Sequence, residues 1–110
     1  MKEYHVKVTA SAESQIEQIT QYVAFDLNNP KAAILLLDAL ETSILGLSNL
    51  PYRFPLVAEE PWRGKGIRIM PVNHFLVCYW INEDVGKVQV TAVIYEKREQ
   101  LRQLSLMDME

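Results

Sequence analysis

One amphipathic stretch in the first half of the chain constrains the fold most. After Asn29-Pro30, apolar residues recur at spacings of three and four, which is typical of a helix with one buried face. The pattern predicts a helix over about residues 30–47, with Asn29 as its N-cap and Pro30 at its first position. Its expected apolar face consists of Ala33, Leu36, Leu37, Leu40, Ile44 and Leu47.

The residues before this helix predict a short strand and a second helix. Residues 4–9 alternate between the two faces of a strand. Apolar residues at helical spacing then predict a helix over about residues 12–26, with Ser11 as its N-cap. Asn28-Asn29-Pro30 interrupts the helical pattern, so the two helices are expected to form an α-hairpin.

Three strand patterns follow one another in the second half, at about residues 67–72, 75–82 and 87–95. Short polar turns separate them, which is typical of an antiparallel meander. The predicted order is β-α-α-β-β-β, an α+β fold with the first strand added to the meander and the hairpin packed on one face. A short final helix over about residues 98–107 is optional.

Tight turns fix a register for the three strands. They pair Arg68 with Tyr79, Phe75 with Ile94 and His74 with Tyr95, and paired residues share a face of the sheet. A bulge at Asn73-His74 would move Arg68 to the other face, and the sequence leaves this alternative open. The face expected to form the core, beneath the helices, consists of Met70, Val72, Phe75, Val77, Tyr79, Ile81, Val88, Val90, Ala92 and Ile94. The second face, expected to be partly open, carries His74, Leu76, Cys78, Trp80, Gln89, Thr91, Val93 and Tyr95.

Composition narrows the class of protein. A chain of 110 residues that is 49% hydrophobic is expected to form a single domain over residues 1–110. The formal charge of −3 argues against a general nucleic-acid binder, whereas residues 51–76 carry more cations than anions. The lone Cys78 is consistent with a reducing cytoplasm. No membrane span, metal site or cofactor is expected.

Three segments together resemble a known family. "LPYRFPLV" at 50–57, "KGIRIMPVNHFLVCYWINED" at 65–84 and "VTAVIYEKRE" at 90–99 are similar to RelE/ParE toxins of bacterial type II toxin–antitoxin modules, the plasmid stabilisation type. The resemblance covers about residues 4–100. It implies the same strand and helix order, and a cognate antitoxin as the partner.

The resemblance implies growth arrest through one of two targets, ribosome-bound mRNA or DNA gyrase. Ribosome-dependent nucleases of the family tend to carry an arginine where this chain has Leu76. They also tend to have an acid–base residue near the C-terminus, where this chain has Leu104 and Met107. Glu96 replaces a glycine of the family's ending. The set expected for an mRNA endoribonuclease is therefore incomplete, and a non-catalytic, antitoxin-binding or decayed toxin module is the alternative.

RNA cleavage requires a base, an acid and cations that stabilise the phosphate. The candidates are Glu60 or Glu59 as the base and Tyr95 or His74 as the acid. Arg68 and Arg98 would bind the phosphate. Each also has a structural interpretation: the cations as partners of carboxylates, His74 as a turn residue, Tyr95 as a strand-end residue and the glutamates as solvated loop residues.

Two further groups of residues are candidates for binding. Arg63 and Lys65, beside Trp62, and Lys97 beyond the last strand are predicted to contact target phosphates. Trp80 lies on the second face of the predicted sheet with Leu76 and Val93. An apolar patch with a polar margin is typical of a protein partner, so these three are the predicted antitoxin-binding residues.

Overall fold

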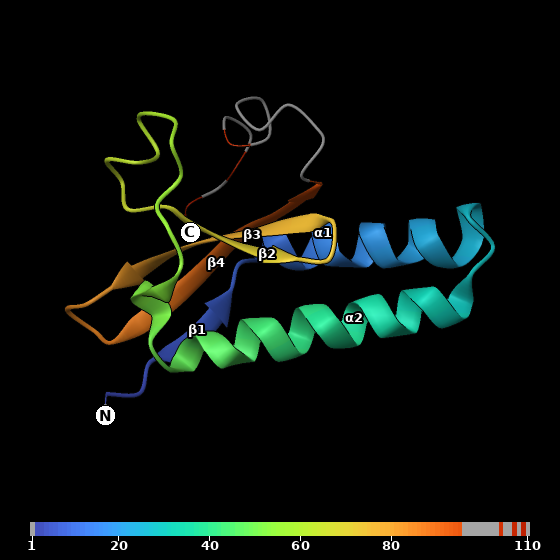
Figure 1. The fold of residues 1–110 in the computed structure, drawn as a ribbon, viewed down its shortest axis with the longest axis horizontal. Helices are drawn as coiled ribbons and strands as arrows, with labels where there is room; N and C mark the ends of the chain where they lie inside the picture. Colours follow the sequence, from blue (N-terminus) through green and yellow to red (C-terminus); the bar gives the residue numbers. More distant parts are fainter. Residues whose placement is uncertain (1, 96–103, 105–106, 108, 110) are drawn as a thin grey trace.

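The computed structural model describes residues 2–95, 104, 107 and 109. A four-stranded sheet carries two long helices on one face, and these helices project as a hairpin beyond the end of the sheet (Figure 1). The elements are β1 (His5–Val8), α1 (Ala10–Gln21), the π-helical turn η1 (Tyr22–Asp26), α2 (Pro30–Leu45), the 3₁₀ turns η2 (Gly46–Ser48) and η3 (Pro51–Arg53), β2 (Arg68–Val72), β3 (Phe75–Asn82) and β4 (Lys87–Tyr95). The predicted α+β order is confirmed. The predicted tail helix lies outside the described residues, apart from Leu104 and Met107.

Capping residues set the ends of the hairpin helices. Asn29 caps α2, because its side chain accepts a hydrogen bond from the amide of Ala32 at 3.2 Å, and Pro30 is the first helical residue. Both were predicted. The predicted N-cap of α1 was wrong by two residues: Thr9, at the end of β1, accepts from the amide of Ala12 at 3.1 Å.

The sheet order is β1-β4-β3-β2, with β1 parallel to β4 and the other pairs antiparallel. The tight β2–β3 turn pairs Val72 with Phe75 and Arg68 with Tyr79, as predicted. Asn73 occupies this turn at φ 55°, a left-handed conformation that asparagine tolerates well. The register therefore places Arg68 on the helix side of the sheet.

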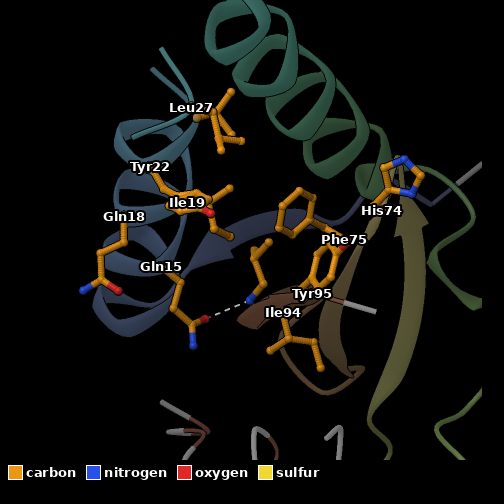
Figure 2. Close-up of a pocket in the computed structure, with 11 residues that line it drawn as sticks. Gln15, Gln18, Ile19, Tyr22, Leu27, His74, Phe75, Ile94 and Tyr95 are labelled. Atoms are coloured by element: carbon orange, nitrogen blue, oxygen red, sulfur yellow. Dashed lines mark hydrogen bonds between the residues drawn. The ribbon is translucent and has the colours of Figure 1, made fainter. Parts of the chain in front are cut away.

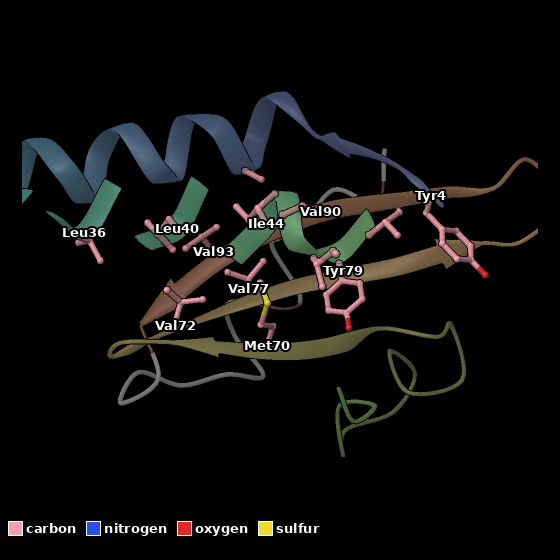
Figure 3. Packing of buried hydrophobic residues seen from close by; sticks show 13 residues of the cluster. Tyr4, Leu36, Leu40, Ile44, Met70, Val72, Val77, Tyr79, Val90 and Val93 are labelled. Carbon is pink, nitrogen blue, oxygen red and sulfur yellow. The ribbon is translucent and has the colours of Figure 1, made fainter. Parts of the chain in front are cut away.

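The main core lies between the hairpin and the sheet (Figure 3). Leu40, Val77 and Val90 are fully buried, and Leu36 and Ile44 are nearly so. Ala92, expected on this core face, is also fully buried, but it belongs to a cluster on the other face of the sheet. Tyr79 lies in the same cluster and donates its buried hydroxyl to the carbonyl of Pro51 at 2.6 Å, which anchors η3 to the sheet.

A β-bulge makes the predicted register of β3 and β4 wrong beyond Val90. Tyr79 pairs with Val90 and Cys78 pairs with Ala92, so Thr91 is an extra residue on β4. Phe75 consequently pairs with Tyr95 and not with Ile94. Because one extra residue reverses the faces of all that follow, Val93 joins the helix-side core. Ala92 and Ile94 lie on the opposite face.

The second face of the sheet, expected to be partly open, is a second core. Leu76 is 7% exposed, and Cys78 and Thr91 are fully buried. The loop after η3 and residues near the C-terminus cover this face. We call the buried residues the back cluster: Val57, Ile67, Leu76, Cys78, Ala92, Ile94 and Leu104.

Candidate functional site

A groove opens between the helical hairpin and the end of the sheet where the β2–β3 turn lies (Figure 2). Its volume is about 720 Å³, within the range of roughly 300–1,000 Å³ that is usual for ligand sites. We call it the hairpin groove. Its lining residues are Gln15, Gln18, Ile19, Tyr22, Val23, Leu27, His74, Phe75, Val93, Ile94 and Tyr95.

One hydrogen bond crosses the floor of the hairpin groove. The side-chain carbonyl of Gln15, on α1, accepts from the backbone amide of Val93 at 2.8 Å. A dashed line from Gln15 marks this bond in Figure 2. β1 pairs with β4 only as far as Val8–Val90, so Val93 lies beyond the end of β1. A helix side chain therefore satisfies an amide at the edge of β4.

The sides of the hairpin groove are apolar and partly exposed. Tyr22 and Leu27, at the hairpin tip, are 51% and 56% exposed. Across from them, the rings of Phe75 and Tyr95 pack edge to face with centroids 5.5 Å apart. Large exposed apolar side chains beside a groove are typical of a binding surface.

The structure separates the residues proposed for RNA cleavage. Tyr95 and His74, the acid candidates, both line the hairpin groove. Arg68 pairs with Tyr79, four residues along β3 from the Phe75 that pairs with Tyr95. Four residues of strand span about 13 Å. Neither Arg68 nor Glu60 is among the described residues that line this groove.

Arg68 and Glu60 are both engaged in local contacts. The guanidinium of Arg68 donates to the carbonyl of Phe54 at 2.7 Å and lies 5.0 Å from the centre of the Tyr52 ring. The carboxylate of Glu60 accepts from the amide of Gly64 at 2.7 Å. These contacts stabilise the positions of η3 and of the loop before β2. Binding of phosphate by Arg68 and action of Glu60 as a base stay predictions.

The remaining cationic candidates lie apart from the hairpin groove or outside the described residues. Arg63 and Lys65 lie in the loop before β2, where the side chain of Arg63 donates to the carbonyl of Val57 at 3.4 Å. Lys97 and Arg98 fall outside the described residues. Their contact with target phosphates stays a prediction.

The three residues expected to bind the antitoxin do not form one surface. Val93 lies on the helix side, whereas Leu76 and Trp80 lie on the other face. Leu76 is buried, and the indole of Trp80 donates to the carbonyl of Met109 at 3.2 Å. The bulge at Thr91 accounts for the displacement of Val93. Their role in binding the antitoxin stays a prediction.

A cluster of hydrogen bonds at the opposite end of the sheet was not predicted. Glu83, in the β3–β4 turn, accepts from Tyr4 at 2.9 Å, from Tyr52 at 2.5 Å and from Lys2 at 2.5 Å. These donors, Lys2 foremost, lower the pKa of Glu83 to about 2. The bond to Glu83 in turn raises the pKa of Tyr52 to about 12. This Glu83 cluster joins the N-terminal segment, η3 and the β3–β4 turn.

Because the pKa of Glu83 is lowered in the folded chain, we expect the stability of the fold to depend on pH. A carboxyl whose pKa is lower in the folded chain stabilises the fold above its unfolded pKa, near 4.5, and loses that contribution as pH falls toward about 2. Glu83→Gln should therefore reduce stability at pH 6, and its difference from the unaltered chain should shrink on acidification. Urea unfolding at pH 6, 4 and 2.5 measures this. Asp84→Asn, in the same turn, is the control, and an equal loss in both variants would contradict the prediction.

The described part of the chain offers little for thiol chemistry or metal binding. Burial raises the pKa of the Cys78 thiol to about 12, so it is not a reactive nucleophile. No group of three or more metal-ligating side chains comes together among the described residues. No helix in this same part is both long enough and apolar enough to cross a membrane.

The fold is that of known toxin–antitoxin proteins. The chain superposes on a structure of the chromosomal ParDE toxin–antitoxin system from P. aeruginosa with a TM-score of 0.69, at 14% identity, over 86% of this chain and 98% of the other. It superposes on the RelBE2 toxin–antitoxin complex from Mycobacterium tuberculosis with a TM-score of 0.62, at 18% identity, over 84% of this chain and 98% of the other. The chain therefore shares its fold with a chain in each of these two toxin–antitoxin structures.

Sequence comparison gives the family. Residues 6–100 match the family described as the ParE toxin of type II toxin–antitoxin system, parDE. The chain belongs to this ParE toxin family. No curated protein matches it in sequence.

Proposed function

We propose that this toxin arrests growth in the cytoplasm by binding DNA gyrase, and that a cognate antitoxin neutralises it. Membership of the ParE toxin family supports the toxin role. Among the described residues, the separation of Tyr95 from Arg68 and Glu60 supports a binding action over RNA cleavage. Tyr95 lies in the hairpin groove, while Arg68 and Glu60 make contacts elsewhere.

Ribosome-dependent mRNA cleavage is the competing target class. A general acid must reach its proton at hydrogen-bond distance, about 3 Å, and the cations must contact the same phosphate. The arrangement of Arg68 and Tyr95 along the sheet does not favour this in the free chain. Charged contacts to the phosphates of the gyrase–DNA complex have no such requirement, because each cation acts by itself.

A single expression experiment distinguishes these targets. The chain is produced from a tightly controlled promoter, and protein synthesis and plasmid supercoiling are followed in the same cells. We expect supercoiling to fall before protein synthesis does. Cleaved mRNA on ribosomes, with supercoiling intact, would overturn the gyrase proposal. Normal growth with a preserved antitoxin complex would instead support a non-catalytic binding module.

Two substitutions test how the toxin acts. Arg98→Ala should relieve growth arrest, because arginine offers phosphates a planar, bidentate and permanently charged donor. Tyr95→Phe should leave growth arrest intact, because it keeps the ring that packs on Phe75 and removes only the hydroxyl. Colony counts on inducing medium measure both. Full loss of toxicity in Tyr95→Phe, together with mRNA cleavage by the unaltered chain, would show that Tyr95 is a catalytic acid.

A further inference from the structure

The outer face of α2, opposite the core, is exposed and partly apolar. Residues three and four positions apart share one side of a helix. We call the exposed residues on this side the outer stripe: Lys31, Ile34, Leu35, Asp38, Thr42 and Leu45. Its three apolar members are between 61% and 68% exposed, while Leu36 and Leu40 are buried on the inner face. A helix with apolar residues on opposite faces is usually covered on both.

Two opposite charges flank the apolar centre of the outer stripe. Lys31 lies three residues before Ile34, and Asp38 lies three residues after Leu35. The two charged positions are two helical turns apart, about 10.5 Å along the axis. No ion pair joins Lys31 or Asp38 to another residue that the structure describes. The pattern is therefore self-complementary about the midpoint between Ile34 and Leu35, with a charge at each end and an apolar pair at its centre.

A second copy of α2 in antiparallel orientation matches both the charges and the apolar pair. A twofold axis through the midpoint places Lys31 opposite the partner's Asp38 and Ile34 opposite the partner's Leu35. A parallel arrangement would set like charges against each other, and it would also align the two helix dipoles unfavourably. An axis at Asp38 would overlap the helices along more of their length, but it would bring two carboxylates together. Charge therefore selects one register.

We propose that the outer stripe joins two copies of this chain in a twofold-symmetric dimer, through an antiparallel contact between their α2 helices. The overlap runs from Pro30, the first residue of α2, to Ala39, its counterpart across the axis, and is about 15 Å long. Because this interface is small, we expect a weak association that depends on concentration. No residue of the outer stripe lines the hairpin groove, so the dimer leaves that groove open on both copies.

Sedimentation equilibrium of the purified full chain at low salt measures the association. We expect the apparent mass to rise from that of a monomer toward that of a dimer as the concentration increases. Lys31→Glu should weaken the dimer by at least about fivefold, because symmetry replaces two attractive charge pairs with two repulsive ones. Lys7→Glu makes the same change of charge at an exposed residue of β1 and should alter the affinity by less than about twofold. A chain that stays monomeric up to about 1 mM would overturn the proposal.

A charge exchange tests the antiparallel register. The double variant Lys31→Glu with Asp38→Lys again places opposite charges across the axis, so its affinity should return to within about twofold of that of the unaltered chain. A role of either charge within its own helix would not produce this recovery. A dimer that Lys31→Glu leaves unchanged, or that the double variant fails to restore, would overturn the proposed interface. A monomeric chain that loses growth arrest in Ile34→Gln would instead assign the outer stripe to the toxin's target.

Discussion

Replacing Leu40 with alanine should lower the free energy of unfolding by about 2–5 kcal/mol, the usual cost of a cavity in a packed core. Leu40 is fully buried on the inner face of α2, in the cluster that joins the hairpin to β3 and β4. Urea unfolding followed by circular dichroism measures the loss.

Leu35→Ala is the matched control for Leu40→Ala. Leu35 lies on the same helix and is 61% exposed, so its truncation should change stability by no more than about 0.5 kcal/mol. If the two variants lose the same stability, the face of α2 that packs on the sheet has been assigned wrongly. If Leu40→Ala also lost toxicity at temperatures where it stays folded, Leu40 would have a role beyond packing.

Strong periodicity made most of the fold predictable. The apolar face of α2 and its Asn29-Pro30 start were enough to predict this helix. The two-residue turn between β2 and β3 was enough to predict their register. These signals are local, and each is repeated along its segment. The sequence did not identify the N-cap of α1, because Thr9 and Ser11 are both good capping residues. Thr9 is the N-cap because β1 ends just before it and α1 begins just after it.

The bulge at Thr91 could not be read from the sequence. Threonine is a favourable strand residue, and it continues the run of β-branched and apolar residues in β4 without a break. Its burial and its hydroxyl bond to the carbonyl of Cys78, at 3.3 Å, depend on contacts across the sheet. One residue thus reversed the predicted faces of Ala92, Val93, Ile94 and Tyr95.

The candidate site was predictable only in part. Tyr95 and His74 were predicted only as candidate acids, and both line the hairpin groove. Gln15 was missed because a glutamine on a helix carries no signal of a contact with the last strand, 78 residues further along the chain. Glu83 was missed for a similar reason, since its partners Lys2, Tyr4 and Tyr52 come from distant segments.

Leu104→Ala should cost at least about 2 kcal/mol of stability, because Leu104 is 2% exposed and belongs to the back cluster beneath the sheet. Leu45→Ala, on an exposed part of α2, is the control and should cost no more than about 0.5 kcal/mol. Urea unfolding measures both.

The cost of Leu104→Ala also distinguishes two surfaces for the antitoxin. A loss of 2 kcal/mol or more means that Leu104 stays packed against Leu76 and the rest of the back cluster, so this face is core in the free chain. The open apolar surface is then the hairpin groove, where Tyr22 and Leu27 remain exposed. A loss no larger than that of Leu45→Ala would mean that the back face opens readily. Leu76 and Trp80 would then be accessible to a partner, as the sequence alone predicts.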